Sequence, residues 1–163
     1  GGAAAARGQP GPTRARRVVL VSLLGTVLEQ RTPEELAEEQ SVAEGAPQAL
    51  GRLLAAGCEV YLVARVADDT TEHIVRALLE SLGVSANAEL LFCETSVGMS
   101  SMARQLEAYA VLGADAAVAE TLRRFIPQLL LVGPKAALPA PLQGARNVVA
   151  CDSFDAAVDA LCG

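Results

Sequence analysis

The chain has 163 residues, of which 52% are apolar and 20% charged, with 13 basic and 19 acidic side chains. This length and composition fit one globular domain and exclude a disordered or fibrous chain. Residues 1–17 contain four Arg and no acid, so residues 18–163 carry nine basic and nineteen acidic groups, a net charge of -10. Such an acidic domain, with five aromatic residues and no Trp, lacks the phosphate contacts and stacking platforms of a nucleic-acid binder.

Cysteine and histidine usage argues against disulfide and metal sites. Cys58, Cys93, Cys151 and Cys162 show no short C-x-x-C spacing, so we expect reduced thiols in a cytosolic setting. The chain has a single His, too few ligands for a typical zinc site, and we predict no metal. The longest apolar run, residues 18–28, is too short to span a bilayer.

The first half of the chain predicts alternating elements. Residues 1–17 are rich in Gly, Ala and Pro and predict a flexible basic linker. A continuous apolar run over 18–23 predicts a buried parallel strand. Thr32 followed by Pro33 predicts a helix start, and a second helix over 47–56 ends at Gly57. A strand is expected over 59–66.

The second half continues this alternation. We expect Asp69 to cap a helix that ends at Gly83, followed by a strand over 90–93 and a loop over 94–100. Two helices then precede Pro127, strands are predicted over 129–132 and 147–150, and Phe154, Val158 and Leu161 share a face of the last helix. The pattern predicts an α/β fold over 18–163, a Rossmann-like three-layer sandwich with a five-stranded parallel sheet. Ligand sites are expected beyond the carboxyl ends of its strands.

The turn after the first strand resembles the first motif of haloacid-dehalogenase-like phosphotransferases, D-x-D-G-T. Gly25 and Thr26 match that motif, whereas Ser22 replaces its nucleophilic Asp and Leu24 its acid/base Asp. An alcohol and an isobutyl group can neither attack phosphorus as a carboxylate does nor hold magnesium. The second motif is also missing, because Val63-Ala64 stands where a Ser or Thr is expected. Gly25 and Thr26 record ancestry or form a tight turn.

Three further features have a structural and a functional interpretation. His73 lies four residues after Asp69, which predicts a local helix contact rather than catalysis. The loop over 94–101 before Arg104 either forms an anion nest or provides a cap from Ser100 or Ser101. The acidic stretch over 34–44 is a solvated face or steers a basic partner.

Several segments together resemble the plant-type peroxin-22 family. The stretch from Leu91 to Glu107 is similar to the family pattern F-C-x-T-x-x-G-x-x-S-x-x-R-Q-L-E. Segments 32–36 and 61–69 are similar to the family's T-P-E-E-L and Y-L-x-x-R-V-x-D-D, and the likeness extends over about 18–162. After Glu107 this chain departs from the family's P-x-x-H-I-D. The matching signature residues are Phe92, Cys93, Thr95, Gly98, Ser101, Arg104, Gln105 and Leu106.

The resemblance implies a peroxisomal membrane adaptor whose domain faces the cytosol. It implies binding of the peroxin-4 ubiquitin-conjugating enzyme, which supports ubiquitination and recycling of the import receptor, with no catalytic residue and no cofactor. Because the sequence starts with Gly and has a basic segment 1–17, we expect a transmembrane anchor upstream. We expect the domain to be monomeric on its own.

Two questions remain open at this stage. The partner surface is assigned to the last strand and helix, with Asp152, Phe154, Asp155 and Val158 as contacts, and Phe154 is either an exposed anchor or a core residue. The alternative function is a degenerate haloacid-dehalogenase-like domain that acts on or binds a small phosphorylated ligand.

Overall fold

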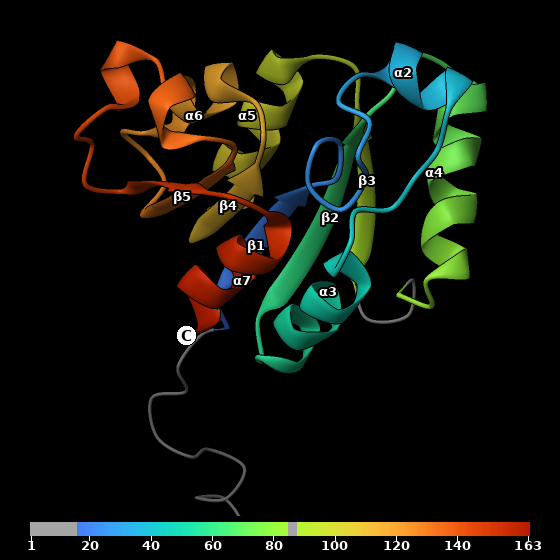
Figure 1. Cartoon of the computed structure of the whole chain (residues 1–163), viewed down its shortest axis with the longest axis horizontal. Coiled ribbons are helices and arrows are strands. Elements are labelled where there is room, and N and C mark those ends of the chain that lie inside the picture. Colours follow the sequence, from blue (N-terminus) through green and yellow to red (C-terminus); the bar gives the residue numbers. More distant parts are fainter. Residues whose placement is uncertain (1–15, 85–87) are drawn as a thin grey trace, which may run out of the picture.

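The computed structural model describes residues 16–84 and 88–163, so most of the predicted linker, residues 1–15, lies outside the described residues. A parallel sheet with the strand order β3-β2-β1-β4-β5-β6 forms the middle layer (Figure 1). Its strands are β1 Val18–Ser22, β2 Glu59–Arg65, β3 Glu89–Cys93, β4 Ala110–Gly113, β5 Gln128–Val132 and β6 Val148–Cys151. The predicted α/β fold is confirmed, but the described sheet has six strands rather than five.

Helices cover both faces of this sheet (Figure 1). They are α2 Pro33–Glu38, α3 Ala46–Ala55, α4 Asp69–Ser81, α5 Ser96–Gln105, α6 Ala116–Leu122 and α7 Phe154–Cys162, with short 3-10 turns η1 Lys135–Ala137 and η2 Ala140–Leu142. One hydrophobic core lies under α3, α4 and α7. The other lies under α5 and α6 and includes Leu138 and Leu142.

Strand β1 contributes to both cores. Val19 and Val21 belong to the core beneath α3 and α7, and Leu20 belongs to the core beneath α5. All three side chains are completely buried. Successive side chains of a strand point to opposite faces, which explains why this segment is continuously apolar rather than alternating.

The strand that the sequence did not predict is β4. It has four residues, Ala110–Gly113, and both Ala and Gly are uncommon in strands, so its propensity is weak. The turn before β4 contains neither Gly nor Pro, so the sequence shows no turn signal there. Glu107 itself adopts the left-handed conformation, with φ 52°. Pairing with β1 begins directly afterwards, where the Tyr109 amide donates to the Val18 carbonyl at 2.8 Å.

The helix boundaries follow local hydrogen bonding. The Glu35 amide donates to the Thr32 hydroxyl at 3.1 Å, which confirms the predicted start of α2. Helix α4 is capped by Asp68 rather than the predicted Asp69, because the Asp68 carboxylate accepts bonds from the Thr71 amide and hydroxyl. These bonds lower the pKa of Asp68. Gly57, which follows the C-cap residue Ala56 of α3, has a positive φ of 85°, as expected of a helix stop.

The chain enters the fold at the amino-terminal edge of the sheet. Arg16, which the sequence assigned to the linker, donates to the carbonyls of Gly57 and Cys58 at 3.1 and 2.9 Å. The Arg17 guanidinium lies over the Tyr109 ring, 4.1 Å from its centroid. Among the residues that the structure describes, no helix is both long and apolar enough to cross a membrane.

All four cysteines have free thiols. Cys93 and Cys151 are buried, Cys58 is partly buried and Cys162 is exposed. Burial raises the pKa of the Cys93 and Cys151 thiols, so both act as small apolar groups.

A tight turn follows β1 and depends on two residues. Gly25 has φ 81°, and its amide lies 2.9 Å from the carbonyls of both Leu28 and Gln30. Thr26 is almost fully buried, and its hydroxyl donates to the Ser22 carbonyl and to the Leu23 carbonyl. A β-carbon at Gly25 would lie 2.7 Å from the β-carbon of Ala114. These contacts support the tight-turn interpretation of the pair.

We predict that Gly25→Ala destabilises the domain more than Gly57→Ala does. Both substitutions place Ala at a positive φ, but only Gly25 has a neighbour in the way, since nothing lies within 4 Å of a β-carbon at Gly57. The clash should add about 1–3 kcal/mol to the loss of unfolding free energy, measured by urea denaturation. Equal losses in the two variants would show that the Ala114 contact yields without cost.

Candidate functional site

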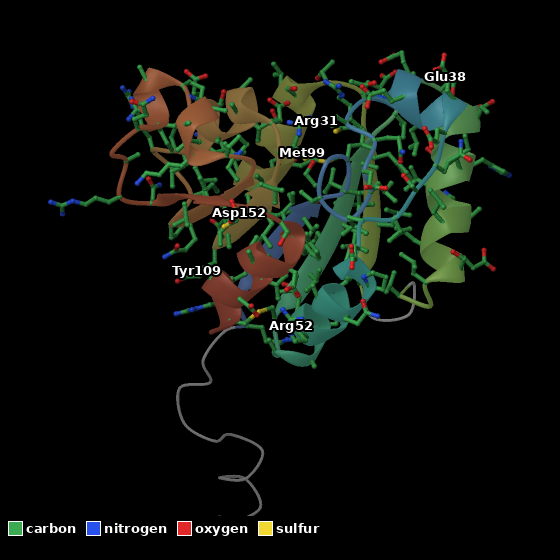
Figure 2. The ribbon with its side chains drawn as sticks, viewed as in Figure 1. Arg31, Glu38, Arg52, Met99, Tyr109 and Asp152 are labelled. Carbon is green, nitrogen blue, oxygen red and sulfur yellow. The ribbon has the colours of Figure 1, made fainter. Side chains whose placement is uncertain are left out.

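A cavity opens at the carboxyl ends of β1, β2 and β4. Its volume is about 430 Å³. The sheet order reverses direction at β1, and such a switch point is where ligands bind in open α/β sheets. Figure 2 shows Arg31 and Met99 at this edge of the sheet, with Tyr109 and Arg52 toward the opposite edge. The lining residues are Ser22, Leu24, Arg31, Thr32, Arg65, Ser96, Met99, Ala114, Asp115, Ala116 and Val118.

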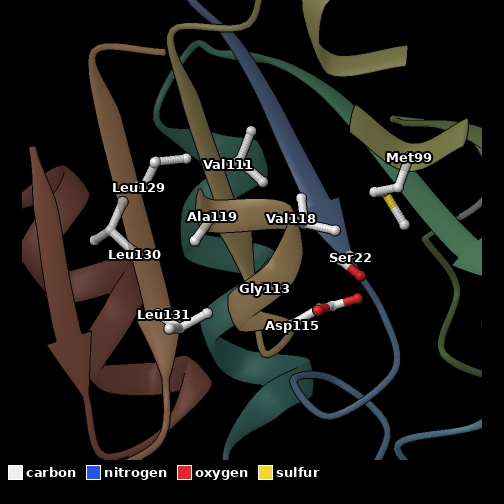
Figure 3. A pocket seen from close by; sticks show the side chains of 10 residues that line it. All are labelled: Ser22, Met99, Val111, Gly113, Asp115, Val118, Ala119, Leu129, Leu130 and Leu131. Atoms are coloured by element: carbon white, nitrogen blue, oxygen red, sulfur yellow. The ribbon is translucent and has the colours of Figure 1, made fainter. Parts of the chain in front are cut away.

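Ser22 and Leu24 occupy the positions that carry carboxylates in the motif they resemble. Ser22 ends β1, and its side chain points toward Asp115 (Figure 3). Leu24 is buried, with 7% of its surface exposed, and packs into the core beneath α3. Neither side chain is ionisable, so this edge of β1 lacks a carboxylate nucleophile and a carboxylate metal ligand.

Asp115 is the one carboxylate in the cavity lining, and its oxygens are occupied. The Ser96 hydroxyl donates to Oδ2 at 2.6 Å, and the Ala117 amide donates to Oδ1 at 2.9 Å. Through the second bond Asp115 caps α6. Among residues 16–84 and 88–163, no group of three or more His, Cys, Asp or Glu side chains could hold a metal ion. Asp115 thus ties α5 to α6.

The space beneath the cavity is closed by apolar side chains. A small void there is lined by residues such as Val111, Val118 and Leu130 (Figure 3). Its volume of about 20 Å³ corresponds to a single water molecule. A ligand could therefore enter only from the open edge of the sheet.

The residues of the predicted signature surround the start and outer face of α5. Thr95 caps the helix by accepting the Gly98 amide at 3.0 Å, so the cap is Thr95 rather than the suggested Ser100 or Ser101. Gly98 leaves little space, since a β-carbon there would lie 3.3 Å from the Thr95 hydroxyl. Cys93 is buried, Phe92 and Leu106 are half-buried, and Ser101, Arg104 and Gln105 are exposed.

The predicted partner contacts divide into buried and accessible residues. Phe154 and Val158 are 2% and 0% exposed, so the exposed-anchor interpretation is wrong and the core interpretation of Phe154 is confirmed. They are buried because α7 packs beside α3, over the sheet. Asp155 forms an ion pair with Arg52 at 3.0 Å, which links α7 to α3. Asp152 is exposed, and its role stays a prediction.

From the sequence, no site role was assigned to three polar residues that line the cavity, Arg31, Arg65 and Asp115. Asp115 follows β4, so missing that strand hid its position at the sheet edge. Arg31 lies in a long connection before α2, and nothing in its local pattern indicates that its guanidinium reaches the Ala114 carbonyl at 3.0 Å. An acid two residues after a short Val-Leu-Gly run was the available signal for Asp115.

Known structures with this fold include two phosphatases. D,D-heptose 1,7-bisphosphate phosphatase from B. bronchiseptica, complexed with magnesium and phosphate, has a TM-score of 0.63 and 15% identity, covering 89% of this chain and 97% of that one. The corresponding enzyme from Burkholderia thailandensis has a TM-score of 0.63 and 16% identity, covering 91% and 100%. At these identities the likeness shows the fold alone.

Sequence comparisons identify the family. Peroxisome biogenesis protein 22 of Arabidopsis thaliana is 33% identical over an alignment of 144 residues, and the match covers 85% of this chain and 49% of that protein. The chain therefore spans about half the length of this curated relative. The family model described as "Peroxisome biogenesis protein 22, Haloacid dehydrogenase-like domain" matches residues 14–156. The chain belongs to the peroxisome biogenesis protein 22 family.

Proposed function

We propose that this domain is a non-catalytic adaptor that binds the peroxin-4 ubiquitin-conjugating enzyme. It recruits that enzyme to the cytosolic face of the peroxisomal membrane, where ubiquitination of the import receptor allows the receptor to be recycled. Tethering raises the local concentration of the enzyme near its target, to the millimolar range for a short linker. Family membership supports the peroxisomal role.

The observation that carries the non-catalytic part is the chemistry at the end of β1. Ser22 and Leu24 stand where this fold's phosphotransfer motif has two carboxylates. The remaining carboxylate, Asp115, caps α6 and accepts the Ser96 hydroxyl. A fold can be retained while its original chemistry is lost, and this pattern favours a binding role over phosphoryl transfer.

We assign the docking surface to the outer side of α5 and the turn that follows α6. Phe125 is 52% exposed and Val97 is 75% exposed, two of the three large apolar side chains that are exposed among the described residues. The Arg104 guanidinium lies 3.8 Å from the centroid of the Phe125 ring and holds it in place. Val97 and Arg104 are seven positions apart, so they share one face of α5.

This surface fits a partner with an apolar depression bordered by acidic side chains. Aromatic and Arg side chains are enriched among interface residues that dominate binding energy. Arg104 would meet such an acidic border with a planar, multiply donating group. The surface replaces Phe154 and Val158, whose side chains are inaccessible.

We predict that Phe125→Ala and Arg104→Ala each weaken binding of the peroxin-4 enzyme about tenfold, or about 1.4 kcal/mol, because each removes a side chain of the proposed interface. Binding is measured by isothermal titration calorimetry. The matched control is Val149→Ala, which trims an exposed apolar residue on β6 and should leave the affinity unchanged. An unchanged affinity in both test variants would overturn this surface, and no association at about tens of micromolar would overturn the adaptor function.

We also predict no magnesium-dependent hydrolysis of p-nitrophenyl phosphate. The cavity edge offers a hydroxyl at Ser22 and an apolar side chain at Leu24 in place of the two carboxylates. The assay compares the wild-type domain with Ser22→Ala, with and without magnesium. Magnesium-dependent turnover that is lost in Ser22→Ala would contradict the adaptor proposal and favour a phosphatase-like enzyme.

A further inference from the structure

Strand β6 leaves one edge of the sheet open. The strand order ends at β6, so β5 pairs with one side of it and no other described strand pairs with the opposite side (Figure 3). The Cys151 carbonyl accepts the Gly133 amide at 2.8 Å, so Cys151 directs its backbone groups toward β5. Alternate residues of a strand direct these groups to opposite sides. The backbone groups of Val148 and Ala150 therefore face the open edge.

A groove runs along this edge. Val148, Val149 and Ala150 all line it, although successive side chains of a strand point to opposite faces of a sheet. The groove therefore lies at the side of β6 rather than over one face of the sheet. Its volume is about 560 Å³, and Lys135 is the one charged residue in its lining. The edge is thus accessible, and it is locally positive in a domain of net charge -10.

Strand β6 lacks the features that keep other sheet edges from pairing. It contains neither a charged residue nor Pro, its pairing with β5 runs without a bulge, and Val149 at its centre is 39% exposed. At the opposite edge of the sheet, β3 begins with the exposed Glu89. The Arg76 guanidinium also lies over the Phe92 ring of β3, 4.9 Å from its centroid. An open apolar edge is a template for a further strand, so β6 is the edge at which another chain can add.

The residues on either side of β6 match a second copy of the same strand. Arg146 and Asp152 stand three positions before and after Val149, and both are exposed. Neither forms an ion pair with another described residue. In an antiparallel pair centred on Val149, Arg146 of each copy lies opposite Asp152 of the other. The same register places Val148 opposite Ala150, and each such pair exchanges two hydrogen bonds through the backbone groups that face the edge.

We propose that the chain forms a two-fold symmetric dimer in which the β6 strands of two copies pair antiparallel, with Val149 on the axis. Every contact then occurs twice, so this register supplies two Arg–Asp pairs, and the assembly closes at two copies. A shift of the register by two residues in either direction keeps backbone pairing but separates Arg146 from Asp152. The dimer differs from the monomer expected from the sequence, because the sequence does not show which strand ends the sheet.

The start of β6 is already fixed in the single chain. The Asn147 side-chain amide donates to the carbonyls of Arg123 and Ile126 at 2.7 and 2.8 Å. An edge that is ordered in advance loses less conformational freedom when a second strand pairs with it. The Val148 amide also donates to the Ala145 carbonyl, but at 3.3 Å this bond is long and leaves the edge available to a closer acceptor.

The dimer goes beyond the adaptor role and does not depend on it. Pairing uses β6, whereas the proposed docking surface consists of Val97, Arg104 and Phe125. Self-association is measured on the chain alone, without the peroxin-4 enzyme. A monomeric chain would therefore leave the adaptor proposal standing, and a chain that does not bind the enzyme would leave the dimer standing.

Sedimentation velocity of the whole chain, over about 5 to 500 µM, tests the dimer. We expect a concentration-dependent change from monomer to dimer with a Kd of about 10–100 µM, because pairing of one short strand buries a small interface. A reducing agent in every sample excludes an intermolecular disulfide through the exposed Cys162. A monomer throughout this range, or species that grow beyond a dimer, would overturn the proposal.

The first variant tests whether β6 is the interface. Val149→Lys places two like charges opposite each other on the axis and should weaken dimerisation at least about tenfold. The matched control is Ala55→Lys, which adds the same charge at an exposed position of α3 and should leave the Kd unchanged. Thermal unfolding followed by circular dichroism verifies that each variant is folded. A dimer that persists in Val149→Lys would show that another surface associates.

A charge exchange tests the register. Arg146→Asp and Asp152→Arg should each weaken dimerisation about tenfold, because two-fold symmetry places like charges opposite each other at both ends of the paired strands. The double variant Arg146→Asp/Asp152→Arg restores opposite charges and should recover the original Kd. Single variants without effect, or a double variant no better than the single ones, would rule out pairing centred on Val149.

Discussion

The fold depends on burying β1 between two parallel neighbours. Val19, Leu20 and Val21 are completely buried and divide their side chains between the two cores, while β2 and β4 pair with the backbone on either side. A strand in this position has no exposed edge and no exposed face, so every polar backbone group must be paired within the sheet. Helices pack over both faces of this strand, and the cavity lies at its carboxyl end.

The same constraint explains how the chemistry at the end of β1 could change without loss of the fold. The turn after β1 is held by Gly25 and Thr26, whose hydrogen bonds run to backbone carbonyls. Ser22 and Leu24 then differ from the carboxylates of the related motif without disturbing that turn. The scaffold shared with phosphatases thus persists in a family described by peroxisome biogenesis.

Most of the fold could be predicted from sequence because strong local signals mark its elements. The run over 18–23, the Thr32-Pro33 start and the glycines after α3 and α4 each act within a few residues. Strand β4 has no such signal, since Ala110–Gly113 owes its conformation to pairing with β1 and β5. The cavity was harder to predict than the strands, because Arg31, Arg65 and Asp115 come together only through the strand order. Phe154 is buried because α7 packs beside α3. The spacing of apolar residues along the helix could not by itself show whether Phe154 is buried or exposed.

The two hydrogen bonds from Arg16 affect how the domain would respond to a pulling force. Arg16 lies two residues before β1 and bonds to the carbonyls of Gly57 and Cys58, which directly precede β2. A pulling force applied at this point along β1 would load its hydrogen bonds to β2 and β4 in shear, so that they resist together instead of opening one at a time. The Arg16 hydrogen bonds would transmit part of that force to the residues directly before β2. Extraction of β1 along its axis would therefore require its bonds to β2 and β4 to break together.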